Sequence, residues 1–353
     1  MNSKNTLVFI IFILSVELLF SQETKYEKFP AQLSFVYPIG TSGQRSVNYF
    51  YNFSLNVLTG STGGIKGCEI GGLLNTNKSN MFGFQVGGIG NITNGNVEGM
   101  QVGGIFSLAD SMSGFQVNGI LSKSNEIRGV QISGIINLSK SANASISGIA
   151  NINKGNLNGI QIAGIYNQTK ELKGIQIGLI NVVDTIKNGC FVGLVSIVKK
   201  GFYDEWTISA ADYLNIGISY KAGAKSFYNI YSVGRNFIED PLWVAGFGFG
   251  HIREINAKYS FQPELVCYTY FPLDFKQIRE TYSLHIKFGF VRNISKKLSI
   301  SFAPSIYGDI KSKEGKYSIA GYKQSFIKPV YTYDKDNSTL EIGFGFSLGI
   351  NIK

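Results

Sequence analysis

Charged residues are scarce in this chain of 353 residues: they make up 16% of it, well below the usual quarter. Aromatic residues reach 13%, which excludes a disordered chain, because such chains have many charges and few aromatics. Three cysteines cannot all pair with one another, so no disulfide framework is implied. Only two histidines are present, whereas metal sites generally draw on clusters of His, Cys, Asp or Glu. The composition therefore favours β-structure that faces something other than plain water.

Signatures of catalysis and of nucleic-acid binding are also missing. The chain contains no G-x-S-x-G elbow and no H-E-x-x-H, and its sparse carboxylates lie mostly in expected turns. Gly246, Gly248 and Gly250 lie within an alternating strand, whereas a phosphate loop opens a helix. The net charge of +10 is dispersed, and its longest basic runs are pairs such as Lys199–Lys200. We therefore expect no enzyme activity, no metal, no cofactor and no nucleic-acid partner.

Long hydrophobic runs are absent after residue 22, so no transmembrane helix is expected there. Before it, Lys4 precedes an apolar stretch of 14 residues, Leu7 to Phe20, interrupted only by Ser15 and Glu17. This stretch is too short for a comfortable membrane span and predicts a secretory signal peptide over residues 1–22. If the mature chain enters a membrane, it must do so as a closed β-barrel.

Residues 64–198 contain nine copies of a repeat of about 15 residues, such as GMQVGGIFS from Gly99 and GVQISGIIN from Gly129. Each copy alternates between an aliphatic face and a face of Gly, Gln, small residues, Ile and Asn, which predicts a strand of about ten residues. Short polar groups between copies have turn composition. Glycine in the middle of the aliphatic face, as at Gly104 and Gly134, is unusual for any strand.

One repeat position forms a column of glutamines, which are candidate lumen or ladder residues: Gln85, Gln101, Gln116, Gln131, Gln161 and Gln176. Two interpretations are open. Glutamine in successive strands can form a side-chain ladder that satisfies amides in a crowded sheet face, which we favour. The same column could line a water-filled path or a polar groove. Cys68 and Cys190 occupy one repeat position on the opposite face and are expected to be small packing residues.

Residues 201–353 differ in character, because 30 of the 47 aromatic residues lie there and only 6 lie in residues 64–198. The last segment alternates without a break, with seven apolar residues from Leu340 to Ile352 separated by Glu, Gly, Ser and Asn. Such strands are typical of transmembrane barrels, which we favour, although a water-soluble sandwich could also produce the pattern. His285 falls on the polar face of a similar strand and is expected in a lumen. Residues 23–63 share the aromatic character, and we expect two strands there that close the barrel against the C-terminal end.

The G-x-Q-[VI]-x-G-[IL]-x-N repeats, following a leader and preceding an aromatic tail, resemble the surface-repeat outer-membrane proteins of Bacteroidota and spirochaetes. The likeness is firm over residues 64–198 and looser over 209–236. It implies a location in the outer membrane or at the cell surface, and it implies no catalytic residue. The copies at Asn143 and Gly189 depart from the pattern.

These observations predict an all-β fold: one antiparallel outer-membrane barrel of roughly 18 strands. Residues 23–63 would supply its N-terminal strands, 64–198 nine repeat strands and 199–353 the aromatic C-terminal strands. The alternative is a repeat solenoid with a smaller C-terminal barrel. The barrel predicts a structural protein or passive pore that contacts outer-membrane lipid and the barrel-assembly machinery. The solenoid predicts a surface-exposed binding or adhesion protein.

Overall fold

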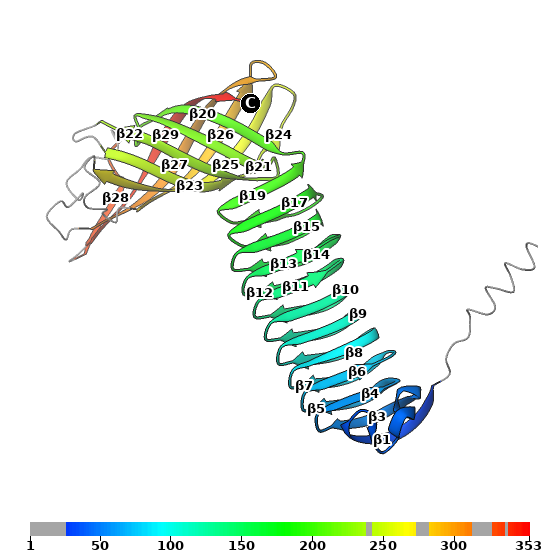
Figure 1. Ribbon diagram of the computed structural model, residues 1–353. Helices are drawn as coiled ribbons and strands as arrows, with labels where there is room; N and C mark the ends of the chain where they lie inside the picture. Colours follow the sequence, from blue (N-terminus) through cyan, green and yellow to red (C-terminus); the bar gives the residue numbers. More distant parts are fainter. Residues whose placement is uncertain (1–25, 238–241, 273–281, 313–326, 336–337) are drawn as a thin grey trace, which may run out of the picture. The chain divides into compact units, whose positions relative to one another are not determined.

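A computed structural model describes residues 26–237, 242–272, 282–312, 327–335 and 338–353 (Figure 1). The predicted signal peptide lies outside these residues. The described chain is all-β apart from one short 3-10 helix, and it combines a β-solenoid of about 10 turns, residues 50–200, with a closed eight-stranded antiparallel barrel. The chain divides into two compact units between Asn125 and Glu126, so both units contain solenoid coils.

The first unit contains nine strands, the 3-10 helix η1 and the start of a tenth strand. Their bounds are β1 (Glu27–Val36), β2 (Ile39–Gly40), η1 (Gly43–Asn48), β3 (Tyr49–Asn56), β4 (Thr59–Thr62), β5 (Gly64–Gly71), β6 (Leu74–Asn77), β7 (Met81–Gly87), β8 (Gly90–Gly103), β9 (Phe106–Asn118) and β10 (Leu121–Ser133). The solenoid strands that follow are β11 (Ile136–Ser139), β12 (Ser141–Ser147), β13 (Ala150–Asn153), β14 (Asn156–Ala163), β15 (Tyr166–Leu172), β16 (Ile175–Ile177), β17 (Ile180–Ile186), β18 (Cys190–Val192) and β19 (Val195–Lys200).

Each repeat is one coil rather than one strand. Equivalent residues of successive copies pair in parallel, as Gln85 does with Gln101 between β7 and β8. The coil runs along one strand, turns at a two-residue corner such as Gly88-Ile89, and returns along a second strand that stacks in parallel on its own equivalents. Interior columns then carry the amide face together with one aliphatic column, which includes Met81, Val97 and Met112, while aliphatic side chains of the repeat motif such as Met100 point outward.

The prediction of a single 18-stranded antiparallel barrel is therefore wrong, and the alternative of a solenoid with a smaller barrel is the one that the structure supports. The expected ten-residue strand contains a corner. Because the corner inserts an even number of residues, the alternation resumes in phase: Gln85, Gly87, Asn91 and Thr93 are all buried, whereas Ile89 between them is exposed. An isoleucine on the amide face, such as Ile89 or Ile105, thus marks the corner in most copies.

The glycines that looked misplaced on the aliphatic face belong to the same corners. A Cβ at Gly104 would lie 2.0 Å from the carbonyl oxygen of Gly88 in the neighbouring coil, so only glycine fits this approach. Gly99, with φ of +132°, meets Gly83 in the same way at the start of its copy. Glycine recurs at these positions because a side chain would prevent the close stacking of neighbouring coils.

The barrel comprises eight strands of residues 203–352. They are β20 (Tyr203–Ala211), β21 (Ile216–Ala224), β22 (Phe227–Asn236), β23 (Leu242–Gly250), β25 (Tyr259–Pro272), β26 (Tyr282–Asn293), β27 (Leu298–Ser312) and β29 (Ser338–Ile352). Two short strands, β24 (Arg253–Glu254) and β28 (Tyr331–Lys335), pair with β25 and β29. Each barrel strand is antiparallel to the next, and β20 closes the circle on β29.

The N-terminal strands do not take part in this closure, contrary to the expectation for residues 23–63. β1 pairs in parallel with β3, and β3 with β5, so these strands extend the solenoid sheet. The last coil, in contrast, is tied to the barrel. Asn229 of β22 donates through Nδ2 to the carbonyl oxygen of Gly193 at 2.6 Å, and the rings of Phe191 and Phe227 meet edge to face.

Candidate functional site

The glutamine column lies inside the solenoid, where each side chain is at most 1% exposed. Within the first unit it forms a continuous ladder: Gln116 donates through Nε2 to Oε1 of Gln101 at 2.9 Å, and Gln101 donates to Gln85 at 2.7 Å. In the second unit Gln176 donates to Gln161 at 2.6 Å. Gln131 lies in the same column, where its register partner in the next coil is Ser145. Five of the six glutamines are therefore bonded to a glutamine of a neighbouring coil, within a buried interior.

Glu69 ends the ladder in the first unit, at the position that glutamine holds in the next coils. Its Oε2 accepts a hydrogen bond from Gln85 Nε2 at 2.7 Å, and its Oε1 accepts one from Asn56 Nδ2 at 3.0 Å. Burial outweighs these hydrogen bonds and raises the pKa of Glu69 from its ordinary 4.5 to about 7. This carboxyl is therefore a titratable group within a neutral amide stack.

A second ladder runs through the asparagine that ends six of the nine copies of the repeat motif, for which the sequence alone predicted no role. In the second unit Asn137, Asn151, Asn167 and Asn181 bond in series, at 2.9, 3.0 and 3.1 Å. Each Nδ2 also donates to a backbone carbonyl of the next coil, as Asn151 does to Ile162 at 2.7 Å. An asparagine six residues after the glutamine, as at Gln85 and Asn91, was the available signal, but this even spacing puts both side chains on one face of a straight strand as well as of a coil with an in-phase corner.

The barrel has a reversed distribution of polarity, apolar outside and polar inside. On β29 the exposed residues from Ile342 to Ile352 are all aliphatic or aromatic, and the residues between them point inward. Ile342 and Ile352 are ten residues apart along the strand, at about 3.3 Å per residue. With the strand tilted by about 40° from the barrel axis, the apolar band is about 25 Å tall. That height matches the apolar band of outer-membrane barrels, which is about 25 Å.

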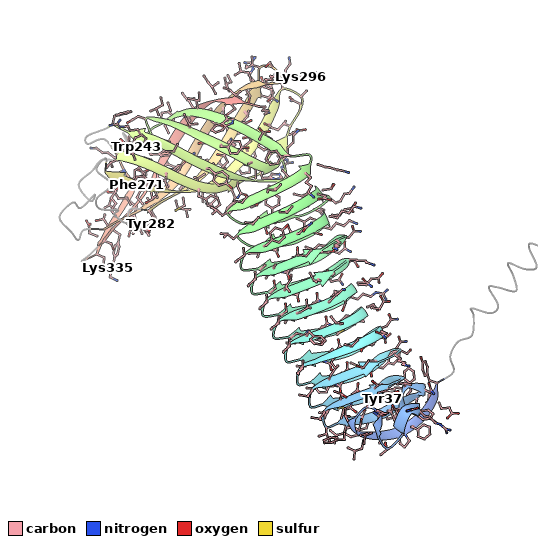
Figure 2. All side chains as sticks on the ribbon, viewed as in Figure 1. Tyr37, Trp243, Phe271, Tyr282, Lys296 and Lys335 are labelled. Carbon is pink, nitrogen blue, oxygen red and sulfur yellow. The ribbon has the colours of Figure 1, made fainter. Side chains whose placement is uncertain are left out.

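Aromatic residues lie near both ends of this band. The only two tryptophans of the chain point outward, Trp206 near the start of β20 and Trp243 at the start of β23, which is at the opposite end of the barrel. Trp243 pairs with Phe271 on β25, and Tyr282 begins β26 at the same end (Figure 2). Tryptophan and tyrosine are enriched where a barrel passes from hydrocarbon to water.

Charged residues fill the inside of the barrel and pair there. The Lys221 ammonium lies 2.7 Å from Oε1 of Glu264 and 3.3 Å from Oε1 of Glu205, and all three side chains are at most 10% exposed. Lys311 and Glu341 form a second pair at 2.7 Å. His285, which the alternation placed in a lumen, is 1% exposed and bonds to Ser283.

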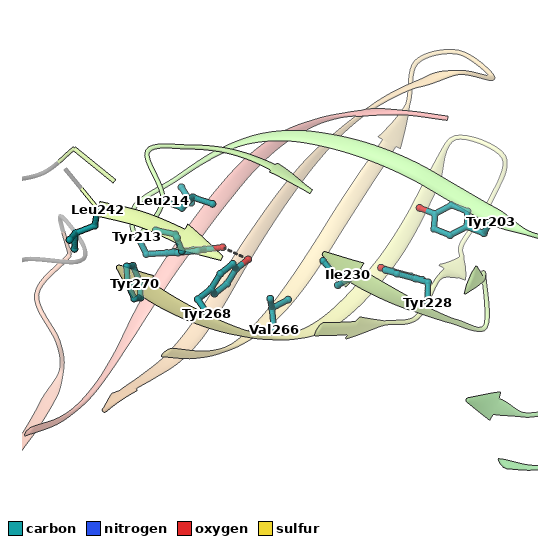
Figure 3. Packing of buried hydrophobic residues seen from close by; sticks show 11 residues of the cluster. Tyr203, Tyr213, Leu214, Tyr228, Ile230, Leu242, Val266, Tyr268 and Tyr270 are labelled. Atoms are coloured by element: carbon teal, nitrogen blue, oxygen red, sulfur yellow. Dashed lines mark hydrogen bonds between the residues drawn. The ribbon is translucent and has the colours of Figure 1, made fainter. Parts of the chain in front are cut away.

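Tyrosines complete the packing of the interior (Figure 3). Tyr213 and Tyr268 join through their hydroxyls at 3.3 Å, and Lys287 donates to the Tyr268 hydroxyl at 2.7 Å. Tyr228 donates to Glu264 at 2.9 Å. An eight-stranded barrel is just wide enough for side chains to fill it. Accordingly, the cavity between Lys221, Glu264 and their neighbours measures about 30 Å³, the space of one water.

The described residues contain no group of three or more His, Cys, Asp or Glu side chains that could hold a metal ion. Cys68, Cys190 and Cys267 are free thiols. Among the helical segments of the described ranges, none has the length and apolar character needed to cross a membrane. No protein-family model, curated protein or solved structure matches the chain.

Proposed function

We propose that this chain is a non-enzymatic outer-membrane protein whose eight-stranded barrel anchors a β-solenoid. The observation that carries the proposal is the reversed polarity of the barrel, with paired charges inside and a mainly apolar surface outside. Such a surface would be a large aggregation hazard in water, and it is what lipid requires. Insertion would then rely on the barrel-assembly machinery, as for other barrels of this class.

The packed interior favours an anchor over a pore. Among the described residues, the space between the ion-paired side chains around Lys221 is about 30 Å³, which is too small for a solute to pass. The passive-pore interpretation requires that Lys221 move away from its carboxylate partners and Lys287 from the Tyr268 hydroxyl, which would separate buried ion pairs at Lys221.

The first prediction concerns the purified full-length protein. The unboiled protein should migrate faster in SDS gels than the boiled one, should require detergent for extraction, and should give no stepwise conductance in planar bilayers. Identical migration before and after boiling, together with recovery in the detergent-free fraction, would contradict the membrane barrel. Stepwise conductance would instead support the pore.

The connections at the two barrel ends predict the orientation. Where β20 begins and β29 ends, the three connections span 225–226, 251–258 and 294–297, whereas connections at the other end reach 273–281 and 313–337. Outer-membrane barrels carry short turns on the periplasmic side and long loops outside. The solenoid precedes β20 directly, so we propose that it lies in the periplasm.

Site-specific labelling tests this orientation in a background with the three native cysteines replaced by alanine. We expect Lys335→Cys, at the end with long connections, to react with a membrane-impermeant maleimide on intact cells. Ser113→Cys, exposed on the solenoid, should react only after the outer membrane is permeabilised. Labelling of Ser113→Cys on intact cells would reverse the orientation and place the solenoid on the cell surface.

A further inference from the structure

The barrel end at which β20 begins opens into a cavity of about 790 Å³. The wall is formed by inward residues of the barrel and by the connections on either side of β24 and between β26 and β27, together with Lys353. Below it, the lumen is filled by Lys221 and its partners, so the cavity is blind. Its size falls within the range of small-molecule sites, and barrel mouths are a common place for them.

Hydrogen bonds between the connections hold the rim in shape. The Asn293 backbone N–H donates to the Lys258 carbonyl oxygen at 2.8 Å, and the Asn293 side chain donates to Ala257 at 3.2 Å. The Ile252 N–H donates to the Lys225 carbonyl at 2.8 Å, and the Lys353 N–H donates to Lys297 at 3.0 Å. The rim is thus organised before any ligand arrives.

The charge of this rim is mostly positive. Lys225, Lys258, Lys296 and Lys353 line the cavity, against one carboxylate, Glu254. Glu254 already forms an ion pair with Lys225, whose Nζ lies 2.7 Å from Oε1 of Glu254. Lys258 and Lys296 form no ion pair with any residue in the described ranges, which leaves two cations uncompensated at the cavity.

We propose that this cavity binds a phosphate-bearing anion, held by the ammonium groups of Lys258 and Lys296. A phosphate group offers several strong acceptor oxygens, so it can engage both lysines at once, and charge-assisted hydrogen bonds of this kind are the stronger ones. The anion is either a soluble phosphate compound or the headgroup of a phospholipid at the barrel rim. The site depends on the barrel mouth alone and stands whether or not the barrel spans a membrane.

Calorimetric titration of full-length protein with inorganic pyrophosphate tests the site. We expect saturable binding in zwitterionic nanodiscs that weakens about 100-fold in Lys258→Gln/Lys296→Gln, because each charge-assisted bond lost is worth about tenfold. Lys335→Gln removes an exposed lysine at the opposite barrel end and should leave the affinity unchanged (Figure 2).

Anionic lipid distinguishes the two sources of the phosphate. If the site takes headgroups, phosphatidylglycerol in the nanodisc competes with pyrophosphate and lowers its apparent affinity in the wild type but not in the double variant. If the ligand is soluble, lipid composition has no effect on pyrophosphate binding. The absence of saturable binding at millimolar pyrophosphate, or equal affinity in wild type and double variant, would overturn the proposal, while the gel-shift test of the barrel would be unaffected.

Discussion

Replacing Lys221 by methionine is expected to destabilise the barrel by about 3–5 kcal/mol, because removal of one partner leaves buried charges without compensation. The ammonium of Lys221 is the centre of an interior cluster: it contacts Glu264, Glu205 and the Gln262 amide oxygen. Methionine has a similar length but no charge, so two carboxylates would face each other in a space without bulk water. The temperature at which the folded band disappears in SDS gels should fall sharply.

Lys225→Met is the matched control for this experiment. Lys225 also forms a carboxylate pair at 2.7 Å, with Glu254, but both side chains are 63% exposed. Exposed pairs contribute about 0–1 kcal/mol, so the control should hardly move the transition. Adding Glu264→Gln to Lys221→Met should recover part of the lost stability, because it removes one of the two buried carboxylates that Lys221 no longer neutralises. Equal transitions for Lys221→Met and Lys225→Met would show that the interior cluster does not support the barrel.

The sequence predicted much of this barrel. Alternation from Tyr282 to Phe290 and from Leu340 to Ile352 correctly indicated strands with an apolar and a polar face, and it put His285 on the inward face. The pairing of Lys221 with Glu264 could not be predicted in this way. The two residues are 43 positions apart and lie on β21 and β25, which are separated by two other strands around the barrel. Only the closed circle brings them together.

The solenoid was harder to predict because one pattern fits two architectures. Period-two alternation is the same for a strand of ten residues and for two short strands joined by an in-phase corner. Two residues broke the pattern in most copies, glycine on the aliphatic face and isoleucine on the amide face, as Gly104 and Ile105 do. Each has its reason in the corner: glycine allows the coils to approach, and isoleucine points outward. The glutamine and asparagine columns likewise take their roles from stacking in parallel, which the sequence alone left open.

Replacing Glu69 by glutamine is expected to stabilise the coils around it at pH 8 and to remove a pH dependence from them. The pKa of Glu69 is raised from 4.5 to about 7 by burial, so the folded state binds its proton more tightly than the unfolded state. Below pH 4.5 Glu69 is protonated in both the folded and the unfolded state, and its contribution to the free energy of unfolding is at its maximum. This contribution is lost as the pH rises to about 7. A pKa difference of this size corresponds to about 3 kcal/mol.

Glutamine at position 69 would continue the ladder instead of ending it in a charge. Its Oε1 can accept from Gln85 Nε2, as the carboxylate does, but its Nε2 would take the place of the oxygen that now accepts from Asn56 Nδ2 at 3.0 Å, so two donors would meet there. Asn56 keeps its other acceptor, Asn75, at 2.9 Å. The loss of one acceptor for Asn56 reduces the expected gain, and we expect about 2 kcal/mol at pH 8.

Hydrogen exchange of backbone amides in β5 and β7 of the full-length protein measures this gain locally, since exchange reports the free energy of opening. At pH 8 exchange should slow by about 30-fold in Glu69→Gln, and the difference from wild type should shrink as the pH falls toward 5. Glu98→Gln changes an exposed carboxylate of the same solenoid and should have little effect. If Glu69→Gln speeds exchange at pH 8, the ionised carboxylate stabilises its coil through the amides that surround it, and burial does not dominate its energetics.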